Sequence, residues 1–237
     1  MGESIMEYLL QGIFKAFHLM LSFDPEVYGI VGFSIKISTI ATFLASLVGI
    51  PAGFAIALRN FKGKSFLIIL TNTLIGMPTV MIGLLGYAFL SRSSLFGFLN
   101  LLFTPKAIII GEFFLSLPII TAFTTSAVQA VDPRAVLTAK TLGAGKFSIF
   151  WTIFMEARFS LLAAVIAGFG RAIGEVGCAM MLGGNIRYYT RTMTTAIALE
   201  ISKGEFGFAL ALGFFLLTVV FSVNIFFYLL QGKGRTG

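Results

Sequence analysis

The sequence predicts an all-α integral membrane protein with about five spanning helices, an N-terminal amphipathic helix and a short polar helix between spans three and four. Hydrophobic residues make up 57% of the 237-residue chain and charged residues only 11%, whereas soluble domains average roughly 25% charged residues. The apolar runs are also longer than the core of a soluble domain requires, and each can cross a bilayer. Together these observations place the chain in a membrane.

Residues 1–28 are predicted to form an amphipathic helix and a linker that lie in the membrane interface. Glu7, Gln11, Lys15 and His18 share one face of this helix, and leucine, isoleucine and phenylalanine side chains cover the other. A helix with one polar and one apolar face fits the boundary between headgroups and acyl chains. A poorly apolar sixth span is the alternative.

Residues 29–237 are predicted to form the membrane domain. A spanning helix needs about 20 apolar residues, and five stretches reach that length. Pro78 and Pro118 should kink two of them, because proline removes a backbone hydrogen bond and clashes with the preceding turn. The five stretches are Gly29–Leu58, Phe66–Leu90, Lys106–Ala127, Phe159–Leu182 and Phe206–Leu230.

A polar loop, residues 128–158, separates spans three and four and must lie outside the bilayer. Asp132-Pro133 is a strong helix start, because aspartate caps free N–H groups and proline fits the first helical position. The helix is expected to run to Leu142 and to stop at Gly143, since glycine readily adopts the left-handed conformation. A second helix follows. A compact helix pair on a membrane surface is typical of an element that docks a soluble partner.

Positive charges predict the orientation of the chain, since lysine and arginine accumulate on the cytoplasmic side. With five spans, the loops after spans one and three and the C-terminal tail share one side. We therefore expect a multi-pass protein of the cell (inner) membrane with its N-terminus outside and its C-terminus in the cytoplasm. The net charge of +7 fits this topology and does not indicate nucleic acid. The positive residues on the cytoplasmic side are Arg59, Lys62, Lys64, Arg134, Lys140, Lys146, Arg158, Lys233 and Arg235.

Catalytic and metal-binding functions find no support in the sequence. The chain has one histidine and no His/Cys/Glu cluster at metal-ligand spacing. Gly143-Ala144-Gly145-Lys146 lacks the full spacing and the preceding strand of a phosphate-binding loop, so the chain is not expected to bind ATP. Cys178 has no histidine or basic neighbour in register that could make it a nucleophile. We expect neither enzymatic activity nor a bound metal or cofactor.

The polar loop resembles the cytoplasmic sequence of ATP-binding-cassette (ABC) importer permeases: Glu-Ala-Ala, three residues, Gly, nine residues, Ile, one residue and Leu-Pro. Ala139, Gly143 and Ile153 match it, whereas Leu137-Thr138 and Met155-Glu156 depart from it. The resemblance implies a type I ABC importer transmembrane domain whose coupling helix seats on cytoplasmic ATPase subunits, which hold the ATP and Mg²⁺. The residues expected to couple to the ATPase are Asp132, Pro133, Arg134, Ala139, Lys140, Leu142 and Gly143.

Later segments resemble the tungstate permeases within that family: Gly174-Glu175-Val176-Gly177, Gly183-Gly184-Asn185-Ile186 and Met193–Glu200. The resemblance implies an oxyanion cargo, tungstate first and molybdate or a sulfate-like oxyanion as the alternative. It also implies an extracytoplasmic oxyanion-binding protein as a partner, and we expect a homodimer because five helices enclose little space. A secondary transporter or a channel is the alternative class, but no internal repeat or filter loop supports it.

Two groups in the spans are candidates for the translocation pathway. Thr121, Thr124, Thr125 and Ser126 follow Pro118, and their hydroxyls either contact the passing anion or bond helix backbones.

Arg171 lies near the middle of the predicted fourth span, with Glu175 one turn later. A charge there costs at least about 2.5–3.5 kcal/mol, so a buried ion pair is the favoured interpretation and direct contact of Arg171 with the anion is the alternative. Lys36 in span one and Glu112 in span three lie nearer the outer surface and either snorkel or pair.

A face of small residues in the fourth span is expected to pack against a second copy or within the chain. It comprises Ala163, Ala167, Gly170 and Gly174.

Overall fold

The computed structural model describes residues 2–233, and within them it contains helices and no strand. The all-α prediction is therefore confirmed. In chain order the helices are α1 (Gly2–Leu21), α2 (Pro25–Leu58), α3 (Lys64–Ile75), α4 (Thr79–Leu90), the 3-10 turn η1 (Gly97–Leu99), α5 (Pro105–Gln129), α6 (Pro133–Thr141), α7 (Lys146–Ile173), α8 (Gly177–Gly183), α9 (Met193–Ser202) and α10 (Phe206–Lys233).

Within residues 2–233, four single helices are long and apolar enough to cross a membrane, namely α2, α5, α7 and α10. Helices α3 and α4, bent by 99° to each other, reach the same length and hydropathy only as a pair, so the described residues hold up to five candidate spans; we call this pair the broken span. The break falls at Gly76-Met77-Pro78, where Pro78 has no N–H to continue the helical ladder. The prediction of about five spans, with a break at Pro78, is confirmed.

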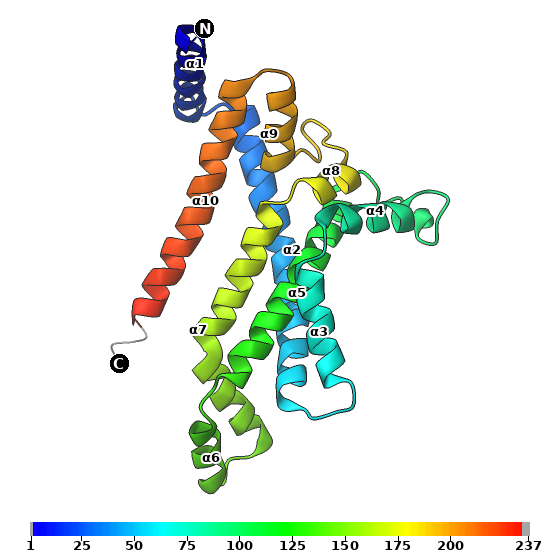
Figure 1. Ribbon diagram of the computed structural model, residues 1–237, viewed down its shortest axis with the longest axis vertical. Helices are drawn as coiled ribbons and strands as arrows, with labels where there is room; N and C mark the ends of the chain where they lie inside the picture. The colour runs from blue at the N-terminus through cyan, green and yellow to red at the C-terminus, as the bar shows by residue number, and fades with distance from the viewer. Residues whose placement is uncertain (1, 234–237) are drawn as a thin grey trace.

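Helix α5 is the central helix of the molecule and packs between α2 and α7 (Figure 1). Glycines permit the close approach. A Cβ added to Gly53 of α2 would lie 2.6 Å from the Cβ of Thr124, and one added to Gly168 of α7 would lie 2.8 Å from Ile120 Cδ1. Because larger side chains would collide there, these two glycines determine how closely α2 and α7 approach α5.

The fourth span differs from its prediction. The sequence predicted a helix from Phe159 to Leu182, but α7 ends at Ile173 and a separate short helix, α8, follows. One distant and one local hydrogen bond hold Glu175 outside the helix: its carbonyl accepts from Thr194 Oγ1, and its carboxylate accepts from the N–H of Cys178, three residues later, at 2.9 Å.

Helix α1 packs on the start of α10, at the end of the molecule opposite α6 (Figure 1). Ala16 is fully buried there, Lys15 Nζ lies 2.6 Å from the Glu205 carboxylate, and the rings of Phe17 and Phe214 are 5.8 Å apart. Phe14 is 74% exposed on another side of α1. The predicted N-terminal helix is confirmed; its place in the membrane interface stays a prediction.

Candidate functional site

Helix α6 occupies one extreme end of the molecule, beyond the junction of α5 and α7 (Figure 1). It forms because its ends are well capped. The Asp132 carboxylate accepts a hydrogen bond from the Arg134 N–H at 2.8 Å, and Gly143 adopts a left-handed φ of 79° directly after the C-cap, Leu142. The predicted start is confirmed, and the helix ends at Thr141, one position earlier than expected.

Large apolar side chains project from this end. Leu142 is 82% exposed, Phe147 79% and Leu137 59%; we call these three residues the docking patch. Apolar side chains exposed outside the membrane commonly mark a contact with another protein. Lys140 and Arg134 are exposed beside the docking patch, while Ala139 is half-buried. That this surface binds an ATPase stays a prediction.

Three of the four hydroxyl residues on α5 lie inside the subunit. Thr121 Oγ1 donates to the Leu117 carbonyl at 2.8 Å, and Thr125 Oγ1 donates to the Thr121 carbonyl at 2.8 Å. Thr124 is fully buried against α2. For Thr121 and Thr125 the geometry therefore favours bonds to helix backbones, the second of the two roles that the sequence left open. The buried Thr124 hydroxyl has no hydrogen-bond partner among the described residues. Ser126, in contrast, is exposed.

The prediction of an ion pair between Arg171 and Glu175 is wrong, since no salt bridge joins these two described residues. The expectation assumed one continuous helix, in which positions i and i+4 share a face. Because α7 ends at Ile173, Glu175 leaves that face; it is 4% exposed and caps α8 through Cys178. Arg171 is half-buried, and the described part of the chain offers it no anionic partner.

The small-residue face of α7 is partly open. Gly170 and Gly174 are exposed, and a Cβ added to Gly170 would meet nothing within 4 Å. Packing within the chain therefore does not use these two positions, although Ala163 and Ala167 are half-buried. Space beside Arg171 is available to a second copy or to a passing anion.

Glu112 and Lys36 do not pair either. Lys36 is exposed on α2, whereas Glu112 is 3% exposed and its Oε2 atom has no hydrogen-bond partner among the described residues. Among the described residues, no group of three or more His, Cys, Asp or Glu side chains is placed to hold a metal ion.

Sequence reasoning missed a network of charges at the end opposite α6. Arg187 Nε donates to the Glu26 carboxylate at 2.7 Å, and this contact raises the pKa of the Arg187 guanidinium above its usual value. Arg191 lies 3.6 Å from both Glu26 and Glu200, and Lys203 lies 2.9 Å from Glu200. The network ties the start of α2 to α9. Local spacing does not predict the contacts of Glu26, which lies 161 residues from Arg187 in the chain, whereas Glu200 and Lys203 are three residues apart.

Comparisons with known proteins agree with this architecture. The family described as "Binding-protein-dependent transport system inner membrane component" matches residues 49–235. The tungstate uptake system permease protein TupB of Peptoclostridium acidaminophilum is 39% identical over 226 residues, which cover 95% of this chain and 99% of that protein. The protein of the same name from Campylobacter jejuni is 36% identical, with 92% of each chain covered.

Similarity extends to more distant proteins, at 28% sequence identity or below. The molybdate/tungstate transport system permease protein WtpB of Pyrococcus furiosus is 28% identical, covering 90% of this chain and 81% of that protein. A solved structure of an amino acid ABC transporter superposes with a TM-score of 0.69 at 15% identity, covering 90% of this chain and 96% of that one. At that identity the likeness shows a common fold.

Proposed function

The chain belongs to the family of binding-protein-dependent transport system inner membrane components, and on this premise we propose that it is the permease subunit of an ATP-driven tungstate importer. Its fold is that of type I ABC importer transmembrane domains. One observation carries the choice of tungstate: identities of 39% and 36% to two tungstate uptake permeases, over at least 92% of this chain.

The ATPase partner is assigned to the end that carries α6. The docking patch would bury its exposed apolar side chains in a cleft on a cytoplasmic ABC ATPase subunit, with Lys140 at the rim of the contact. ATP and Mg²⁺ would be held by that subunit. Co-purification tests this arrangement: recovery of an ATPase subunit supports the importer, and a permease that transports tungstate without one would be a secondary transporter or a channel.

The translocation pathway is assigned to the interface between two copies of the chain. The open face of α7 at Gly170 and Gly174 allows a close approach of the second copy. Arg171 beside it has no anionic partner within the described residues, so its guanidinium is free to bind an oxyanion in passage. The extracytoplasmic binding protein would dock at the end opposite α6, near α9.

Molybdate is the second candidate, favoured by the 28% identity to a molybdate/tungstate permease. Uptake of radiolabelled tungstate, in a strain that lacks other oxyanion importers, separates the two. We expect unlabelled tungstate to compete strongly, molybdate weakly and sulfate not at all. Equal competition by tungstate and molybdate would assign a mixed specificity, and absence of tungstate uptake would refute the proposal.

Cysteine labelling tests the orientation, with the N-terminus outside and the C-terminus in the cytoplasm of a multi-pass inner-membrane protein. In a Cys178→Ala background, cysteines at Lys62 and Lys146 should resist a membrane-impermeant thiol reagent applied to intact cells. Cysteines at Ser94 and Lys203 should react. Labelling at Lys146 from outside would invert the topology and remove α6 from the compartment that holds ATP.

A further inference from the structure

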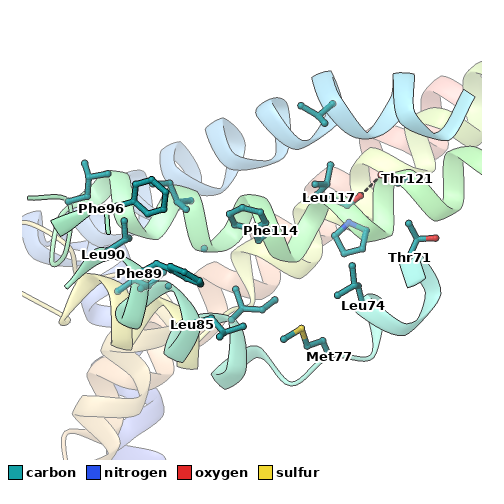
Figure 2. Close-up of a pocket in the computed structure, with 18 of the residues that line it drawn as sticks. Thr71, Leu74, Met77, Leu85, Phe89, Leu90, Phe96, Phe114, Leu117 and Thr121 are labelled. Atoms are coloured by element: carbon teal, nitrogen blue, oxygen red, sulfur yellow. Dashed lines mark hydrogen bonds between the residues drawn. The ribbon is translucent and has the colours of Figure 1, made fainter. Parts of the chain in front are cut away.

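A partly open cavity of about 680 Å³ lies between the broken span, α3 and α4, and the central helix α5. Figure 2 shows Phe114 of α5, Leu85 and Phe89 of α4, and Leu74 of α3 arranged around it. The cavity exists because the 99° bend swings α4 away from the line of α3 and leaves α5 uncovered along one face.

The cavity has the dimensions of one leaflet. It follows α5 from Ile110 to Thr121, a rise of about 16 Å at 1.5 Å per residue, and half the hydrocarbon core of a bilayer is about 15 Å. This length and volume accommodate an extended hydrocarbon chain that lies along α5.

The lining offers nothing to a polar ligand. Its hydroxyl groups belong to Thr71 and Thr121, and both donate to carbonyls of their own helices: Thr71 to Leu67 at 2.9 Å and Thr121 to Leu117 at 2.8 Å (Figure 2, dashed line). Transfer of water or an oxyanion into such a space would leave its hydrogen bonds unmade. The occupant is therefore apolar.

Positive charge lies at the mouth of the cavity. Lys106 is one turn before Ile110 on α5, so it shares the cavity face at the end remote from α6. It is exposed and makes no ion pair among the described residues. Arg92, also exposed and outside those ion pairs, lies in the segment that brings Phe96 to the cavity. Two unpaired cations at the outer boundary of a spanning helix fit a lipid phosphate.

We propose that this cavity binds one acyl chain of an anionic phospholipid from the leaflet opposite α6, with the lipid phosphate on Lys106. Lipid tails are as apolar as the lining, so burial of the tail in a bilayer gives little net gain. The positive charge at the mouth of the cavity therefore determines which lipid headgroup is bound preferentially. This lipid site is separate from the tungstate pathway assigned to the face of α7.

The single tryptophan of the chain provides the probe. Trp151 lies on α7, away from the cavity lining, and Trp151→Phe creates a background in which Phe114→Trp is the single tryptophan and lies in the cavity lining. The full-length chain is reconstituted in nanodiscs of unlabelled phosphatidylcholine that carry a minor fraction of either phosphatidylglycerol or phosphatidylcholine with brominated acyl chains, which quench nearby tryptophan. Phe221→Trp in the same background is the matched control, because Phe221 is 69% exposed on α10.

We expect brominated phosphatidylglycerol to occupy the site about fivefold more tightly than brominated phosphatidylcholine, as one lysine contact with an anionic lipid implies. Lys106→Gln should abolish the difference and Lys106→Arg should keep it, which also controls for folding. The Phe221→Trp control should respond equally to both lipids.

Equal quenching of Phe114→Trp by the two lipids, or a preference that survives Lys106→Gln, would overturn the proposal. So would a Phe114→Trp signal that neither lipid quenches while Phe221→Trp is quenched, since protein would then fill the cavity. None of these outcomes depends on tungstate transport.

Discussion

Leu142→Glu tests the docking patch directly. Leu142 is 82% exposed, so the substitution should change the free energy of unfolding of the permease by no more than about 0.5 kcal/mol. Full burial of a leucine contributes about 1.5–3 kcal/mol. If Leu142 is buried on the ATPase, its loss should weaken association about 10- to 150-fold, and the desolvation of a buried glutamate should weaken it further.

The assay is the dissociation constant of the purified permease for its ATPase subunit, measured with the melting temperature of each variant. Leu95→Glu is the matched control: Leu95 is 78% exposed and lies in the loop between α4 and η1, before the end of α5 that is remote from α6. The control should bind the ATPase as the wild type does. Wild-type affinity in Leu142→Glu, or an equal loss in Leu95→Glu, would refute the reasoning.

Three further predictions follow from the same structure. Asp132→Ala should cost about 1 kcal/mol of α6 stability and reduce tungstate uptake, while Asp132→Asn retains both; equal uptake in the two variants would contradict this. Arg171→Gln should abolish uptake with little change in melting temperature, whereas Glu175→Ala should lower stability by about 1–3 kcal/mol, because the buried N–H of Cys178 loses its acceptor; the reverse pattern would restore the ion-pair interpretation. Lys15 lowers the pKa of the Glu205 carboxyl, so the stabilisation from this pair is present above the unfolded pKa of about 4.3 and is lost as pH falls through the lowered value. The difference in Tm between wild type and Glu205→Gln should therefore vanish in acid, and a difference that persists would contradict the pairing.

Local signals in the sequence predicted α6 closely. Asp132, Pro133 and Gly143 act within their own turns, so their identities alone determine where the helix starts and stops. The spans were predictable for a similar reason, since the length and composition of an apolar run decide whether it can cross a bilayer.

The contacts between helices were not predictable from local spacing. Glu175 lies outside α7, where Thr194, far along the chain, holds its carbonyl, and no pattern around Arg171 reveals this. The surroundings of the α5 hydroxyls were likewise not predictable from local spacing. Whether Thr124 faces a pathway or a helix depends on Gly53 of α2, which leaves room for the Thr124 methyl group. Periodicity shows which residues share a face, and the partner of that face is decided by the rest of the fold.

Transport in proteoliposomes tests the central claim most directly. Vesicles would contain this chain and its ATPase subunit, with ATP enclosed on the side of α6 and a tungstate-binding protein with radiolabelled tungstate on the other side. The account predicts accumulation of tungstate that requires both ATP and the binding protein and that Leu142→Glu abolishes. Accumulation without ATP, or full accumulation by the Leu142→Glu variant, would contradict it.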